Sequence, residues 1–220
     1  MKYTTVIFDM DGTILYTLDD LTDAANYALK KMGYPLKNVE QVKGFVGNGV
    51  KKLIERCLPQ MATKEEFDKS YDYFSEYYKV HCYDKTRSYR GVKELIALLK
   101  EKSFKTAVVS NKDDYAVKEL CKTFFNGLFD SELGVTDSIA KKPAPDLCEI
   151  ALKELNSTKS EAVYVGDSDV DFMTAKNTGL KFIGVSWGFK GREFLENLGS
   201  ETVVDNPEEI FALLSGEKNV

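Results

Sequence analysis

Apolar positions repeat along this chain in two ways, and each predicts a different structure. The continuous apolar run Val6-Ile7-Phe8 is typical of a buried strand. Between residues 18 and 78, apolar side chains recur every three or four positions, which predicts three consecutive amphipathic helices. From residue 91 onward, helical periods alternate with short β-branched runs, which predicts strands joined by helices. The strands expected in this part are 106–110, a short one near Phe129, 162–165, 182–185 and 202–204.

Short-range signals indicate where the three early helices begin. Thr17 with Asp20 resembles a capping box at the start of the first, and Thr63 with Glu66 resembles one at the start of the third. The glycine-rich stretch 44–49 between the first two helices is expected to be a flexible turn.

The order of these elements predicts an α/β protein with an insertion. Alternating strands and helices indicate a parallel sheet covered on both faces, which makes three layers. The early helices occupy roughly seventy residues, more than an ordinary connection between two strands needs. We therefore expect residues 1–15 and 84–220 to form an α/β core domain and residues 16–83 to form an inserted helical domain.

Composition and charge narrow the class of protein. The 220 residues include 43% hydrophobic and 30% charged residues, as in ordinary globular proteins. A formal net charge of −5 argues against nucleic acid or an anionic membrane as a partner. The four cysteines form no CxxC pair, and no stretch resembles a secretory signal or a membrane span. We therefore expect a cytoplasmic protein without disulfides or a zinc site, in which the single histidine, His81, has a structural or surface role.

Polar residues with chemical potential lie at the ends of the predicted strands. Asp9 and Asp11 follow the first strand, 110–112 (Ser-Asn-Lys) ends the second, and 166–171 follows a later one. Lys142 lies shortly before a predicted helix. Ligands bind parallel sheets at the carboxyl ends of the strands, so we expect these groups to share one crevice. Carboxylates gathered there suit Mg²⁺, and a hydroxyl, a backbone N–H and a lysine beside the cation suit a phosphoryl group.

Two other ligand-binding motifs fail on spacing. The stretch 167–171 begins like a calcium-binding EF-hand loop, but Phe172 and Thr178 stand where that loop needs Gly and Glu. The stretch 44–49 approaches a P-loop, but Val50 replaces the phosphate-binding lysine and no strand precedes it.

The four polar segments resemble the four motifs of the haloacid dehalogenase superfamily of phosphohydrolases, in the same order. The matches are Asp9-Met10-Asp11-Gly12-Thr13, Ser110-Asn111, Lys142-Pro143 and Gly166-Asp167-Ser168-x-x-Asp171. The resemblance spans the chain and implies a Rossmann-like core with an α-helical cap inserted between the first two motifs. Within the superfamily, the stretches 47–50 (Gly-Asn-Gly-Val) and 184–188 (Gly-Val-Ser-Trp-Gly) are most similar to phosphoglycolate phosphatases.

This resemblance implies a role for each motif residue. It implies that Asp9 is the nucleophile, forming an aspartyl-phosphate, and that Asp11 is the general acid and base. It also implies Mg²⁺ held by the side chains of Asp9 and Asp167 and the backbone carbonyl of Asp11. Asp171 is expected to orient Lys142 or a metal-bound water. The residues expected to bind phosphate are Ser110, Asn111, Lys142, Gly12 and Thr13, and those expected to select the substrate in the cap are Gly47, Asn48 and Gly49.

The expected function is therefore Mg²⁺-dependent hydrolysis of a small phosphate monoester resembling phosphoglycolate, by a monomer or homodimer. Pyrophosphatases, sugar-phosphate phosphatases and phosphomutases of the same superfamily are the alternatives. A phospho-acceptor signalling domain is disfavoured, because such domains have two adjacent acids and no helical insertion, whereas Asp9 and Asp11 are separated by one residue.

Overall fold

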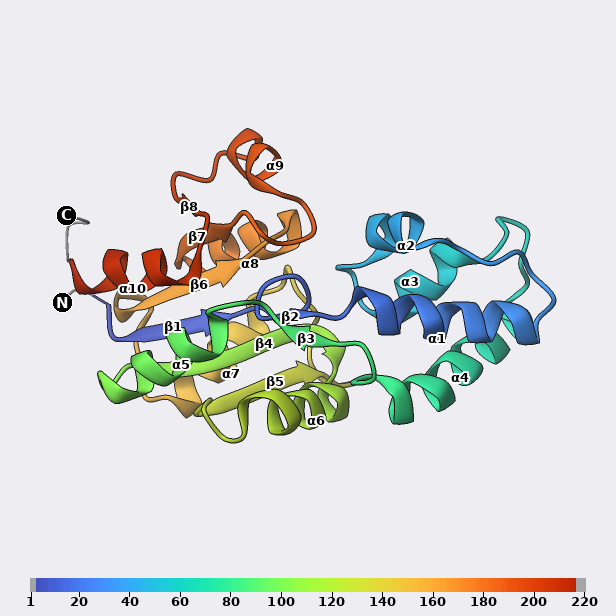
Figure 1. Cartoon of the computed structure of the whole chain (residues 1–220), viewed down its shortest axis with the longest axis horizontal. Helices are drawn as coiled ribbons and strands as arrows, with labels where there is room; N and C mark the ends of the chain where they lie inside the picture. Colours follow the sequence, from blue (N-terminus) through green and yellow to red (C-terminus); the bar gives the residue numbers. More distant parts are fainter. Residues whose placement is uncertain (1–2, 217–220) are drawn as a thin grey trace.

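The computed structural model describes residues 3–216, and its main part is a six-stranded parallel sheet (Figure 1). Residues 1–2 and 217–220, the outer ends of the expected core domain, lie outside the described residues. The strand order is β5-β4-β1-β6-β7-β8. The strands are β1 (Thr5–Phe8), β4 (Lys105–Asp113), β5 (Ser131–Val135), β6 (Ala162–Gly166), β7 (Lys181–Val185) and β8 (Val203–Val204).

Helices cover both faces of the sheet, as the alternating pattern predicted. Along β1, Val6 and Phe8 point into one apolar cluster and Ile7 into the other, because successive strand residues face opposite sides. The first cluster includes α5 (Val92–Glu101), α6 (Asp114–Phe125) and α10 (Pro207–Ser215), and the second includes α7 (Asp146–Glu154) and α8 (Asp169–Thr178). The predicted three-layer, Rossmann-like α/β fold is thus confirmed.

Four helices, rather than the expected three, lie to one side of the sheet (Figure 1). They are α1 (Leu18–Lys31), α2 (Val39–Phe45), α3 (Val50–Cys57) and α4 (Lys64–His81). The sequence pattern did not predict α2, whose start is a capping box between Asn38 and Gln41. The expectation of a turn over 44–49 is wrong in part, because Gly44 and Phe45 lie within α2. The capping box predicted at Thr63 is confirmed.

The capping box predicted from Thr17 and Asp20 is wrong, since no side-chain bond caps α1. The buried carboxylate of Asp20 instead accepts hydrogen bonds from the backbone amides of Lys85 (3.0 Å) and Thr86 (2.8 Å). These amides lie just before β3 (Arg87–Ser88), which pairs antiparallel with β2 (Leu15–Tyr16). Asp20 therefore fastens together the two chain segments that connect the helices with the sheet.

The remaining elements are short. Sequence periodicity did not reveal α9 (Arg192–Asn197) or the 3₁₀ helix Lys159–Glu161, because such short segments hold too few periods. All four cysteines are free and buried. His81 stacks on Tyr77 and lies 2.7 Å from Asp84, which agrees with a structural role. Within residues 3–216, no helix is both long and apolar enough to cross a membrane.

Candidate active site

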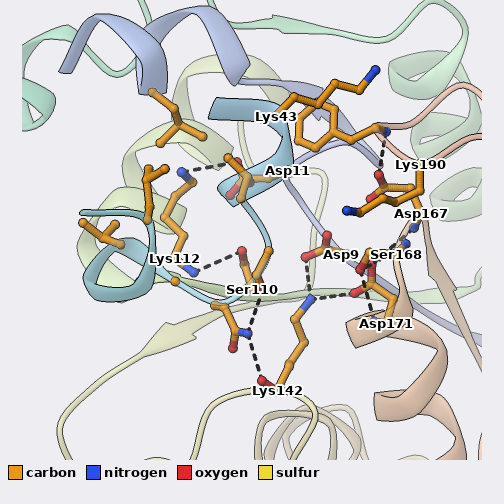
Figure 2. A pocket seen from close by; sticks show the side chains of 18 residues that line it. Asp9, Asp11, Lys43, Ser110, Lys112, Lys142, Asp167, Ser168, Asp171 and Lys190 are labelled. Atoms are coloured by element: carbon orange, nitrogen blue, oxygen red, sulfur yellow. Dashed lines mark hydrogen bonds and ion pairs between the residues drawn. The ribbon is translucent and has the colours of Figure 1, made fainter. Parts of the chain in front are cut away.

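The centre of the site is a buried lysine held between two carboxylates (Figure 2). Lys142 is 3% exposed, and its Nζ donates to Asp9 Oδ1 (2.6 Å) and to Asp171 Oδ1 (2.8 Å). Asp9 follows β1, and Asp171 lies in the first turn of α8, which follows the neighbouring strand β6. The carboxyl ends of adjacent parallel strands thus bring together residues that are far apart in the sequence, as the motif analysis predicted.

Asp171 is held by donors on both carboxylate oxygens. Its Oδ2 accepts from the Ser168 hydroxyl (2.6 Å) and from the amides of Asp167 (3.2 Å) and Ser168 (3.1 Å). Its Oδ1 accepts from Lys142 and from the Tyr164 hydroxyl (3.0 Å), which itself accepts from Lys142 (3.0 Å). Ser168 also caps α8, so the local start of the helix fixes the orientation of the carboxylate.

Asp167 lies in a close-fitting space beside the first motif. Its Oδ1 accepts from the Thr13 hydroxyl (3.2 Å) and its Oδ2 from the amide of Phe189 (2.7 Å). A Cβ at Gly12, whose φ is +89°, would lie 2.5 Å from Asp167 Oδ2, and a Cβ at Gly188 would clash with the same side chain. Gly12 and Thr13 thus pack around Asp167, and neither is among the described residues that line the cavity. Their expected phosphate binding stays a prediction.

The carboxylates outnumber the positive charge near them. Burial and then the charge of Asp171 raise the pKa of Asp9 to about 7, although Lys142 opposes the shift. Burial, Asp171 and Asp9 likewise raise the pKa of Asp167 well above its usual range. Burial alone would lower the pKa of Lys142, but Asp171 and Asp9 outweigh it and hold that pKa above its ordinary value. One ammonium group therefore leaves this group of acids short of positive charge.

The donor set fits a divalent cation beside two of these acids. Single oxygens of Asp9, Asp167 and Asp171 lie within 4.8 Å of one another. Asp171 is already occupied by five donors. Asp9 Oδ2 receives no hydrogen bond from residues 3–216, and each oxygen of Asp167 receives one. Asp9 and Asp167 thus retain lone pairs for a hard cation. Asp171, whose oxygens are occupied, is instead suited to hold Lys142 in place.

Asp11 lies apart from this group and has different partners. Its Oδ1 accepts from the Thr17 hydroxyl (2.7 Å) and lies 3.2 Å from Lys112 Nζ. Both Asp11 and Lys112 line the same cavity as Asp9. The two acids of the first motif, which are only one residue apart, thus face different cations, Lys142 for Asp9 and Lys112 for Asp11.

The residues of the second motif line the cavity and also contact the helical domain. Ser110 is 2% exposed, and its Oγ accepts from the amide of Lys112 (3.3 Å). The Asn111 side-chain Nδ2 donates to the carbonyls of Gly47 (3.1 Å) and Lys142 (2.9 Å). Its buried Oδ1 has no partner in the described part of the chain. The Asn111 side chain therefore joins a loop between helices to the third motif.

The glycine-rich loop lies over the carboxyl edge of the sheet. Besides the bond from Asn111, the Lys141 ammonium donates to the carbonyl of Asn48 (3.1 Å). Gly47 and Gly49 line the cavity, whereas Asn48 lines a neighbouring groove. The cavity together with its open mouth encloses about 640 Å³ of space outside the protein atoms.

Four residues near the acids were given no role in the sequence-based site. Lys112 was expected in the shared crevice without a role, and its spacing from Ser110 places both on one side of a strand. Tyr164 lies inside an apolar strand run, and Lys43 and Lys190 lie in segments without a motif. Lys43, from α2, and Lys190, after β7, line the cavity (Figure 2).

Comparisons with known proteins agree with this geometry. The chain matches the haloacid dehalogenase-like hydrolase family over residues 6–185. A phosphoglycolate phosphatase of Vibrio parahaemolyticus is 31% identical over 96% of this chain and 95% of its own length. The pyrophosphatase PpaX of Listeria welshimeri is 28% identical over 99% of this chain and 99% of its own length.

Solved structures show the same similarity. A crystal structure from Lactobacillus delbrueckii subsp. bulgaricus, provisionally named a phosphoglycolate phosphatase, has a TM-score of 0.92 and 37% identity, covering 97% of this chain and 99% of its own. The crystal structure of a predicted phosphoglycolate phosphatase from Haemophilus somnus has a TM-score of 0.90 and 26% sequence identity. The match covers 97% of this chain and 98% of that chain. With its sheet, its strand-end acids and these matches, the chain belongs to the haloacid dehalogenase-like hydrolase family and is a phosphatase.

Proposed function

We propose that this phosphatase is Mg²⁺-dependent and hydrolyses a small phosphate monoester resembling phosphoglycolate. The observation that carries the proposal is the contact of Lys142 with Asp9, beside Asp167, in a cavity that Ser110 also lines. Relatives named phosphoglycolate phosphatase support the choice of substrate. We also propose that residues 16–83 act as the cap, because cavity-lining residues come from both the helices and the sheet edge.

The proposed reaction has two displacements at phosphorus. An Asp9 oxygen forms a bond to phosphorus, and the bond from phosphorus to the leaving oxygen breaks with its electron pair. The Asp11 carboxyl gives its proton to that oxygen, which leaves as an alcohol. Water then attacks the aspartyl-phosphate and passes a proton to the Asp11 carboxylate. The bond between phosphorus and Asp9 breaks, its electron pair returns to Asp9, and inorganic phosphate is released.

The remaining residues make attack on a negatively charged phosphoryl group feasible. The side chains of Asp9 and Asp167, with the Asp11 carbonyl, would hold the cation, and a bound divalent cation supplies charge that offsets the acids and the phosphoryl oxygens. Lys142, oriented by Asp171, adds a positive charge. The Ser110 hydroxyl and the backbone N–H of Asn111 are proposed to hold the non-reacting oxygens.

Charge at the far end of the cavity supports a substrate with a second anionic group. Lys43 has no ion-pair or hydrogen-bond partner among residues 3–216, and Lys190 Nζ lies 5.5 Å from the centre of the Phe194 ring. In Figure 2 both lie on the opposite side of Asp9 from Lys142. A carboxylate or second phosphate on the substrate would pair with them. Phosphoglycolate and pyrophosphate both carry such a group.

Release of inorganic phosphate from a panel of substrates with Mg²⁺ tests the proposal. The panel contains phosphoglycolate, pyrophosphate, glycerol phosphate, sugar phosphates and nucleotides. We expect the highest kcat/KM with phosphoglycolate. A preference for pyrophosphate would establish the alternative suggested by the PpaX relative. Isomerisation of a sugar phosphate without phosphate release would identify a mutase and contradict hydrolysis.

A further inference from the structure

Lys112 is a buried cation to which the reaction above gives no role. It is 3% exposed, lies near the end of β4, and donates from Nζ to the Tyr78 hydroxyl (2.8 Å). The same Nζ lies 3.2 Å from Asp11 Oδ1 (Figure 2). Tyr78 is 2% exposed and belongs to α4. One ammonium group thus connects the sheet, the proposed acid and a helix of the inserted domain.

The surroundings keep this lysine charged and the tyrosine neutral. Burial alone would lower the pKa of Lys112, but Asp11 and Tyr78 outweigh burial and raise that pKa above its ordinary value. Burial raises the pKa of Tyr78 well above its ordinary value, so its hydroxyl stays neutral and accepts from the lysine. A buried charge costs several kcal/mol unless partners compensate it, so both partners determine where the ammonium lies.

The contacts of Asp11 distinguish its two oxygens. Oδ1 accepts from the Thr17 hydroxyl and forms an ion pair with Lys112, whereas no described residue donates to Oδ2 or forms an ion pair with it. An oxygen that accepts one hydrogen bond and faces an ammonium group is poorly suited to carry a proton itself. In the acid form of Asp11 the proton therefore belongs on Oδ2, the oxygen left available for the cavity.

We propose that Lys112 is a positioning residue that, held by Tyr78, orients Asp11 so that Oδ2 delivers the proton to the leaving group. This inference rests on the proposed acid role of Asp11. Because Tyr78 lies on α4, the orientation of Asp11 depends on the packing of the helical domain against the carboxyl edge of the sheet.

Substrates that differ in their need for a proton test this role. Phosphoglycolate expels an alkoxide, which must be protonated, whereas nitrophenyl phosphate expels a stable anion. The measurement is kcat/KM, which reports the first displacement, for Lys112→Met and for the wild type with each of the two substrates. For phosphoglycolate we expect a loss of about 10-fold or more, within the ~10²–10⁴-fold contribution of general acid catalysis. For nitrophenyl phosphate we expect a loss below about threefold, because little acid catalysis is there to lose.

Further variants separate positioning from folding. Tyr78→Phe should also reduce kcat/KM more for phosphoglycolate than for nitrophenyl phosphate, but by a smaller factor than Lys112→Met. Lys112→Arg, which keeps the positive charge, should lose less kcat/KM for phosphoglycolate than Lys112→Met. Lys112→Met added to Asp11→Asn should have no further effect on phosphoglycolate. Matched controls are Lys105→Met, at the other end of β4, and Tyr73→Phe, also on α4. Melting temperatures establish which variants are folded, and Tyr78→Phe alone suffices for the comparison if Lys112→Met does not fold.

The outcomes also separate this inference from the proposed function. Equal losses on both substrates, no loss, or a further loss in the Asp11→Asn background would overturn the positioning role while leaving the phosphatase mechanism intact. A wild-type protein that hydrolyses neither substrate, or an Asp9→Asn variant with full activity, would overturn the mechanism and with it the role of Lys112.

Discussion

The two acids of the first motif differ in their surroundings at the scale of single residues. Asp9 contacts Lys142 and lies beside Asp167, where a cation fits, whereas Asp11 contacts Thr17 and Lys112. These contacts support separate duties for two carboxylates that the sequence presents as a close pair. The division of labour can be tested one side chain at a time.

Asp9→Asn keeps the size of the side chain and removes the carboxylate that we propose as the nucleophile. We expect kcat for phosphoglycolate to fall by about 10³-fold or more, because loss of a nucleophile abolishes the covalent route. Phosphate release measures the effect. Asp169→Asn, an exposed acid in the first turn of α8, is the control and should keep wild-type activity. Parental activity in Asp9→Asn would rule out the aspartyl-phosphate.

Asp11→Asn should separate turnover from metal binding. We expect kcat to fall by about 10²–10⁴-fold through loss of the general acid and base. The increase in melting temperature on adding Mg²⁺ should persist, because the proposed ligand from Asp11 is its backbone carbonyl. In Asp167→Asn the same Mg²⁺-induced increase should shrink. The assignment fails if Asp11→Asn keeps full activity, or if Asp167→Asn responds to Mg²⁺ like the wild type.

At the scale of elements, a buried carboxylate helps to hold the connection between helices and sheet. Asp20, in the first turn of α1, accepts from the amides of Lys85 and Thr86 just before β3. These contacts span more than sixty positions of sequence, as the separations of 65 and 66 residues show. The paired β2 and β3 beside them come directly before and after the four helices α1–α4 in the chain.

Asp20→Ala leaves these two amides without their acceptor. We expect a loss of about 1–3 kcal/mol in the free energy of unfolding, the cost of leaving buried polar groups unsatisfied. Denaturant unfolding gives this value. The neighbouring Asp19→Ala removes an ion pair with the exposed Arg87 and the acceptor of a long hydrogen bond from Tyr16 (3.3 Å), and it should cost no more than about 1 kcal/mol. Equal losses of unfolding free energy in the two variants would mean that the buried contacts of Asp20 stabilise the protein no more than the ion pair of Asp19 does.

At the scale of the whole molecule, the site is assembled from two parts of the fold. The loop at Gly47–Gly49 contacts the sheet edge through Asn111 and Lys141, and cavity-lining residues come from both sides. Gly49 has a φ of +83°, and a Cβ there would lie 3.0 Å from the Asn111 carbonyl oxygen. The loop can therefore approach the sheet closely only with glycine at this position.

Gly49→Ala should push the loop away from the sheet and impair substrate binding. Strain at positive φ costs about 1–3 kcal/mol, so we expect kcat/KM for phosphoglycolate to fall by about tenfold, the equivalent of 1.4 kcal/mol. Gly33→Ala is the matched control, since its φ is +73° and nothing lies within 4 Å of the added Cβ. Similar melting temperatures with a loss of activity only in Gly49→Ala would support the role of the loop. Equal activities would contradict it.

Local patterns predicted much of this fold because they report burial on each element. Continuous apolar runs located most sheet strands, because the central strands are buried on both faces. The period-3.6 pattern located most helices, since one face of each helix must be apolar. Predictions were wrong or absent where an element was too short to show a period, or where residues with the spacing of a cap make tertiary contacts instead. α2 and α9 hold only seven and six residues. Thr17 and Asp20 had the spacing of a cap, but tertiary partners take both side chains.

The sequence by itself determined that strand-end acids, a hydroxyl and a lysine would meet at one edge of a parallel sheet, because strand direction and motif order are properties of the chain. Only the tertiary structure decided which donor meets which acid. Lys142 reaches Asp9 across 133 positions, and Tyr78 on α4 holds Lys112 of β4. Such pairings depend on side-chain direction and helix packing, which no local pattern records.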